Sequence, residues 1–203
     1  SPFGVSRMLC DFDLKKDLTP NLEVSGGLIP TASANYYLRY FEVEGQSERN
    51  QTYVLEATRV HQLAGGWSST TGWDEGVGKK FDNPKMRDGV TWVDHVSGSG
   101  WHKANSNLLS GSRSTPGGGV WLKPESYVGN HASQSFLNES ADINMNVTNL
   151  INQTRGDNRG GGGYLIKFSG SYENDGTALD LKFFSRHTNT VYAPRLEVRW
   201  DDV

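Results

Sequence analysis

The final apolar run of the chain alternates strictly between apolar and charged side chains. Residues 196–201 read LEVRWD, so Leu196, Val198 and Trp200 are each followed by a charged residue. Successive side chains of a strand point to opposite faces, and this run therefore predicts a strand with one buried face and one solvated face. Pro194 precedes the run, where a missing N–H does little harm. We expect this strand to pair centrally in a sheet and to complete the fold.

The same period of two recurs in three earlier segments, SRMLCDFDL, NYYLRYFEVE and TYVLEATRV, each of which predicts a strand. In the first segment, Met8, Cys10 and Phe12 share one face. The long connection over residues 15–34 carries the Pro, Gly and Ser of a surface loop and is long enough to be ordered. Because only 35% of the residues are hydrophobic and 24 are Gly, the apolar material must lie in short pieces between turns. An all-β fold follows.

Two further elements are expected in the second half of the chain. Val147, Leu150, Ile151 and Thr154 have helical spacing, with Asn146 as the N-cap and Gly156 as the stop. This is the one short helix that we expect. The runs GGGGYLIKFSGSY and ALDLKFFSRH flank ENDGT, and an Asp-Gly pair between alternating runs predicts a β-hairpin. Its second strand would direct inward three apolar side chains, those of Leu179, Leu181 and Phe183.

The whole chain, residues 1–203, is expected to form a single antiparallel β-sandwich domain, since sandwiches of this length are commonly undivided. The chain does not begin with Met, which indicates a processed protein or a piece of a longer one. The 20 basic and 23 acidic residues give a net charge of −3, which argues against a nucleic-acid partner. The single cysteine, Cys10, cannot form an internal disulfide. No apolar run is long enough for a membrane span.

The motifs of common enzymes are missing from the sequence, and we expect no catalytic activity. Asp74 and Glu75 are adjacent, so in a strand they would point to opposite faces rather than form an acid/base pair. The five histidines show no H-x-H or H-E-x-x-H spacing, which disfavours a zinc site. No cofactor is expected other than a structural calcium ion, for which the middle of the chain contains candidate aspartate ligands.

The middle of the chain combines tryptophans with Gly, Ser and Asp, as in long loops. Trp67, Trp73, Trp92, Trp101 and Trp121 lie in this part of the chain, where burial of the rings would anchor loops onto the sheets. The same part of the chain contains Asp82, Asp88 and Asp94. Loop carboxylates of this kind are either ordinary solvated acids or ligands of a structural calcium ion, and both interpretations stay open.

The order of several motifs resembles that of the DNRLRE-type domains. These motifs are SRMLCDFDL, GWDEGVGKKFDNPKMRDGVTW, TPGGGVW, INMNVTNLI followed by GGGGYLIKF, and the closing FFSRHTNTVYAPRLEVRW. The resemblance covers nearly the whole chain. It implies a two-sheet jelly-roll sandwich related to carbohydrate-binding modules, here with a long insertion between DEG and GVTW. The ending TVYAPRLEVRWDD is also similar to versions found in structural proteins of tailed bacteriophages.

Two functions follow from this resemblance and from the aromatic residues. A virion structural protein would pack against copies of itself or other virion proteins, and Tyr36, Tyr37, Tyr40, Phe41 and Phe184 indicate a sheet surface that a second layer or a partner covers. The alternative is an extracellular or virion module that binds polysaccharide. In that case Trp67, Trp101 and Trp121 would stack on sugar rings, which requires that they be exposed.

Overall fold

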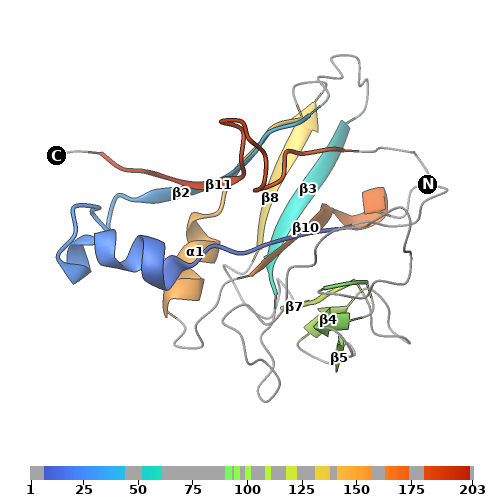
Figure 1. Cartoon of the computed structure of the whole chain (residues 1–203), viewed down its shortest axis with the longest axis horizontal. Helices are drawn as coiled ribbons and strands as arrows, with labels where there is room; N and C mark the ends of the chain where they lie inside the picture. Colours follow the sequence, from blue (N-terminus) through green and yellow to red (C-terminus); the bar gives the residue numbers. More distant parts are fainter. Residues whose placement is uncertain are drawn as a thin grey trace.

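The chain folds around two antiparallel sheets, which the computed structural model in Figure 1 shows together with a few short helical segments. The structure describes residues 7–43, 52–60, 90–92, 94–96, 99–101, 108–110, 118–122, 131–137, 141–156, 163–173 and 181–201. For residues 96, 99–100, 108–110, 120–122 and 156 it describes the backbone alone. The predicted all-β class is confirmed.

The larger sheet has four strands in the order β1, β10, β3 and β8, each antiparallel to its neighbour. Its longest strand, β3, alternates as the sequence predicts, so that Tyr53, Leu55 and Ala57 face the core. Met8 and Cys10 of β1 pack against the same core, as does Phe12 just after the strand. The strands are β1 (Met8–Cys10), β3 (Thr52–Arg59), β8 (His131–Leu137) and β10 (Tyr164–Phe168).

The smaller sheet has three strands in the order β11, β2 and β9, again all antiparallel. Tyr36, Leu38 and Tyr40 of β2 are buried, while the residues between them face the other way. In Figure 1, β2 and β11 lie side by side and run away from the upright strands β3 and β8. The strands of this sheet are β2 (Asn35–Tyr40), β9 (Ile143–Asn146) and β11 (Arg195–Arg199).

One hydrophobic core contains the inward residues of both sheets, and two helical segments enlarge it. The first is α1 (Thr148–Gly156), in which Leu150 and Ile151 are fully buried. Asn146 lies one residue before the N-cap rather than at it, because Val147 accepts the first helical hydrogen bond, from the N–H of Ile151. The Asn146 side-chain oxygen still accepts the N–H of Thr148, the first helical residue, at 3.0 Å. The helix ends at the predicted Gly156.

The second segment lies in the connection between β1 and β2, which is ordered as predicted. It contains a single π-helical turn, η1 (Leu14–Leu18), and two 3₁₀ turns, η2 (Thr19–Asn21) and η3 (Glu23–Ser25). Leu14, Leu18 and Leu22 are buried in the common core. Their spacing of four residues places them on one side of a helical backbone. This spacing predicts a helical segment with a buried side, whereas the Pro, Gly and Ser content of the segment predicts a surface loop.

Two expectations for the end of the chain are wrong. The closing strand β11 lies at the edge of its sheet, with β2 beside it, and Trp200 is 39% exposed rather than buried. The predicted hairpin after β10 does not form among the described residues. A 3₁₀ turn, η4 (Gly170–Glu173), follows β10, and Phe183 instead bridges to Glu42. Leu181 and Phe183 pack against the core as expected, whereas Leu179 lies outside the described residues.

Two small antiparallel pairs complete the described strands. One pair consists of β4 (Asp94–Val96) and β5 (Ser99–Gly100), and the other of β6 (Leu108–Ser110) and β7 (Val120–Leu122). In the second pair, β7 contacts β3 of the larger sheet. A Cβ atom on Gly119 would come within 3.3 Å of the Leu165 side chain of β10. Part of the sheet's outer face is therefore covered.

Candidate functional site

The predicted sugar-stacking tryptophans fall into two groups in the structure. Trp101 is 3% exposed, and its indole N–H donates to the carbonyl of Thr91 at 3.0 Å, so it anchors a loop. A buried indole has no open face, which removes Trp101 from the predicted platform. Trp67 lies outside the described residues, and Trp121 lies in β7, where the backbone alone is described. The prediction for these two residues remains untested.

Of the three predicted calcium ligands, the structure describes only Asp94. Asp94 is buried in β4, where its backbone N–H donates to the Thr91 hydroxyl at 2.9 Å and its carbonyl accepts from the Thr91 N–H at 2.8 Å. Asp82 and Asp88 lie outside the described residues, as do Asp74 and Glu75. Among the residues that the structure describes, no three His, Cys, Asp or Glu side chains gather as a metal site would require. Calcium binding by the three aspartates stays a prediction.

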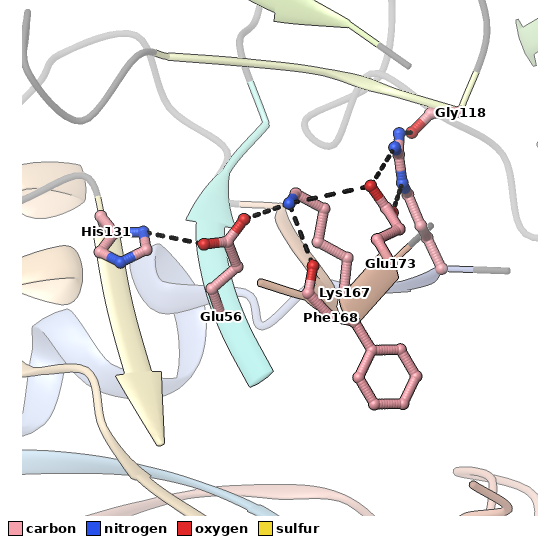
Figure 2. A network of polar contacts seen from close by, with 7 residues as sticks. Glu56, Gly118, His131, Lys167, Phe168 and Glu173 are labelled. Carbon is pink, nitrogen blue, oxygen red and sulfur yellow. Dashed lines mark hydrogen bonds and ion pairs between the residues drawn. The ribbon is translucent and has the colours of Figure 1, made fainter. Parts of the chain in front are cut away.

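A chain of alternating charges crosses the larger sheet, as Figure 2 shows. Glu56 of β3 accepts from the ammonium group of Lys167 on the adjacent strand β10, and His131 Nδ1 of β8 lies 3.9 Å from the same carboxylate. Lys167 also donates to the carbonyl of Phe168 at 3.2 Å and lies 4.0 Å from Glu173 of η4. Each carboxylate in this chain has a cation beside it.

Arg7 forms the other end of this charge network. Its guanidinium donates twice to Glu173, from Nε at 2.5 Å and from Nη2 at 2.9 Å, and Nη1 donates to the carbonyl of Gly118 at 2.6 Å. The ring of Trp92 lies 5.0 Å from the same guanidinium. The side chains of Arg7, Lys167, Glu173 and Glu56 are at most 14% exposed. Because these groups are buried and neutralise one another, the network joins segments of the fold rather than offering a reactive group to a substrate.

Gly118 belongs to the motif TPGGGVW, and the network explains its presence. Its φ of +68° is in the left-handed region, and a Cβ atom there would lie 2.6 Å from Arg7 Nη1 and 2.7 Å from Trp92 Cη2. Only glycine satisfies both conditions without displacing its neighbours. This motif therefore serves the packing of a loop against the sheet.

A second set of polar and aromatic side chains lies on the outer face of the smaller sheet. The register pairs Arg195 with Arg39 and Glu197 with Tyr37, so these four residues of β11 and β2 share the face opposite the core. Phe41 and Tyr192 extend the same surface at one end. We call this surface the arginine–aromatic face and define it by Tyr37, Arg39, Phe41, Tyr192, Arg195 and Arg199.

Arginine side chains lie over aromatic rings across this face. The guanidinium of Arg39 is 5.4 Å from the centroid of the Phe41 ring, and that of Arg195 is 5.2 Å from it. Tyr192, which is 47% exposed, lies 5.4 Å from Phe41 and stacks on Phe184 at 5.5 Å. Such contacts hold the flexible arginines in place and keep their charges at the surface.

Glu197 lies among the arginines of this face, since it alternates with Arg195 and Arg199 along β11. Its carboxylate accepts from Arg199 Nε at 2.6 Å and lies 3.8 Å from Arg39 Nη1. The hydrogen bond from Arg199 lowers the pKa of Glu197, and the charges of Arg199, Arg39 and Arg195 act in the same direction. Asn144 of β9 accepts from both Arg39 and Arg199 at 3.2 Å. Three arginines stand against Glu197 and the exposed Asp201, which has the same parity just beyond β11, so one positive charge is left over on this side.

The sequence partly predicts this face. The sequence predicts five aromatic residues on a covered outer surface, and Tyr37, Phe41 and Phe184 lie on the outward side. The prediction is wrong for Tyr36 and Tyr40, which point into the core because alternation along β2 turns them inward. No sequence motif marks the arginines as a site. Alternation along the strand still predicts the position of Arg39. It lies two residues from both Tyr37 and Phe41 and therefore shares their face.

Cys10 is not a reactive nucleophile in this setting. Burial raises the pKa of its thiol from 9.0 to about 12, although a hydrogen bond with Tyr40 acts in the opposite direction. Burial also raises the pKa of Tyr40. The thiol therefore stays protonated and serves in packing against the core.

No family model, curated protein or solved structure matches this chain. Within the described residues, no helix has the length and apolar character needed to cross a membrane.

Proposed function

We propose that this chain is a non-catalytic structural protein of a virus particle and that it acts by packing against neighbouring proteins. The observation that carries this proposal is the arginine–aromatic face. Tyrosine and arginine are enriched among the residues that dominate binding energy at protein interfaces. The rings of Tyr37 and Phe41 and the charges of Arg39, Arg195 and Arg199 provide this composition on one side of a sheet.

The proposal includes the finer details of fold and location. The two sheets with a common core are consistent with a jelly-roll sandwich, the architecture implied by the resemblance to DNRLRE-type domains. The similarity of residues 190–202 to phage structural proteins supports a place in the virion as a capsid, neck, tail or baseplate component. A virion component packs against its neighbours many times over, which requires a rigid domain. A single hydrophobic core that contains residues of both sheets supports such rigidity.

Analysis of purified particles tests this function. Mass spectrometry of particles from the virus that encodes this chain should find it in a fixed ratio to the other virion proteins. Tyr192→Ala should lower its incorporation, whereas Leu28→Ala, at a 91% exposed position away from the face, should not. Absence of the chain from purified particles would contradict the proposal.

Polysaccharide binding is the second candidate function, and one feature of the same face favours it. Tyr192 is exposed and stacked on Phe184, and Asn144 and the arginines supply polar groups for hydroxyls nearby. A glycan array followed by titration calorimetry would test it. Saturable binding that Tyr192→Ala abolishes would support this function, and the absence of binding to any polysaccharide would remove it.

A further inference from the structure

One edge of β11, to which no other described strand is bonded, points to a specific partner. β2 pairs with one side of β11, and among the described residues no strand pairs with the other. An unpaired edge presents backbone N–H and C=O groups that can accept another strand. The register of β11 with β2 continues without a shift, so no bulge turns this edge away.

The residues along this edge are complementary to themselves. Residues 195–201 read RLEVRWD, and β11 ends at Arg199, so pairing over this segment extends the strand through Asp201. If two copies of this segment run antiparallel with Val198 opposite Val198, Arg195 faces Asp201 and Glu197 faces Arg199 across the pair. On the other face, Leu196 meets Trp200. Every charged residue of the segment thus meets its opposite, and every apolar residue meets another.

Other registers lack this match. Centring the pair on Glu197 places glutamate against glutamate and Arg195 against Arg199, and centring it on Arg199 opposes arginine to arginine. Centring it on Leu196 brings Pro194, which has no N–H, into the ladder opposite Val198. A shift by one residue brings inward side chains opposite outward ones.

We propose that a second copy of this chain pairs antiparallel with β11, with the two-fold axis at Val198. The two three-stranded sheets then join into one sheet of six strands across the axis. This inference rests on the proposed assembly role and names its partner. An isologous contact of this kind closes on itself and gives a dimer.

The exposure of the edge residues is consistent with this contact. Leu196 and Val198 pack against the core but are only partly buried. Trp200 is 39% exposed, and the Arg199 and Glu197 side chains are 41% and 31% exposed. A second strand would cover the apolar side chains on one face and supply a cross-strand partner to each charged one on the other. Pro194 lies just outside the paired segment, where it costs no hydrogen bond.

Charge reversal tests both the dimer and its register. The wild-type chain should sediment as a dimer at about 100 μM and dissociate on dilution. Glu197→Arg places arginine against Arg199 of the second copy, and Arg199→Glu places glutamate against Glu197, so each variant alone should dimerise at least about tenfold more weakly. An equimolar mixture of the two variants restores opposite charges at both pairs and should form a heterodimer. The double variant should form a homodimer again.

Matched controls separate this contact from a general effect of charge. Glu23→Arg and Lys15→Glu make the same reversals at exposed positions of η3 and η1 and should leave the dimer intact. A wild-type chain that stays monomeric at about 100 μM overturns the inference, while the virion role still depends on particle composition. Two single variants that dimerise as the wild type does, or a mixture that does not recover, also overturn it.

A cysteine pair gives a test that does not depend on charge. In a Cys10→Ser background, Val198→Cys brings two thiols together across the axis, and mild oxidation should link the dimer covalently. Glu197→Cys in the same background should link poorly, because its nearest counterpart in the partner is Arg199. Preferential cross-linking at position 197 would place the axis elsewhere and overturn the register.

Discussion

The guanidinium of Arg199 lies over the ring of Tyr37, with its carbon 3.9 Å from the ring centroid. The two residues come from adjacent strands, β11 and β2, that are far apart in the sequence. The ring contact fixes the arginine where its Nε reaches Glu197 at 2.6 Å. This cross-strand contact therefore places the group whose hydrogen bond contributes most to lowering the pKa of Glu197.

Replacing Arg199 should change how Glu197 titrates. Arg199→Gln removes the hydrogen bond that lowers the pKa of Glu197, and this pKa should rise toward its ordinary value. Because the pKa is lowered in the folded state, Glu197 contributes stability above its unfolded pKa, which is lost as the pH falls through the folded pKa. Carboxyl-carbon NMR titration at a concentration where the chain is monomeric measures the change. Arg186→Gln at an exposed position outside the face is the control, and an unchanged pKa in Arg199→Gln contradicts the assignment.

Lys167 should be costly to remove because it neutralises buried carboxylates. Lys167→Met leaves Glu56 without its nearest cation and should lower the free energy of unfolding by about 3–5 kcal/mol. Adding Glu56→Leu removes the uncompensated charge and should restore much of the loss. Urea unfolding measures both variants, and Lys15→Met at an exposed position should change stability by less than about 0.5 kcal/mol. If the double variant is less stable than Lys167→Met, the proposed charge compensation is wrong.

Gly118 and Gly26 provide a matched pair that tests the close packing around Gly118. Both have positive φ, +68° and +82°, but a Cβ atom on Gly118 would clash with Arg7 and Trp92 whereas one on Gly26 meets open space. Gly26→Ala should cost about 1 kcal/mol from backbone strain, and Gly118→Ala about 2–3 kcal/mol because steric overlap is added. Chemical denaturation compares the two variants. Equal losses would show that the close packing around Gly118 contributes nothing.

Cys10 should react with thiol reagents far more slowly in the folded chain than in the unfolded chain. Its pKa of about 12 keeps the thiolate scarce at pH 8, so modification by a chromogenic disulfide should follow the urea unfolding curve. The pKa is raised in the folded state, so the contribution of Cys10 to stability is present below the unfolded pKa and declines as the pH rises from 9.0 toward about 12. The Cys10→Ala variant should lose that part of the alkaline dependence. Rapid labelling of the folded chain at pH 8 would contradict the assignment.

Side-chain alternation along a strand predicts part of the candidate site but not all of it. The outward positions of Tyr37, Arg39 and Phe41 follow from their spacing alone, because a strand admits only two faces. Their contact with Arg195 and Arg199 does not follow, since it requires the register of β2 with β11, which the strands' separate sequences leave open. The burial of Lys167 was likewise beyond local patterns, because the cover over the outer face of the larger sheet comes from distant segments.

By itself the sequence determined the all-β class, the shared inward face of Met8, Cys10 and Phe12, the helix ending at Gly156 and the order in the long connection. These features depend on side-chain alternation and on capping groups a few residues apart, which are local. Only the tertiary structure decided that β11 lies at an edge, that Trp200 is partly exposed and that the segment around Phe183 pairs with Glu42 rather than with β10. Those outcomes depend on which distant segments compete for the same strand edge and the same core, a competition in which no single stretch of sequence contains both partners.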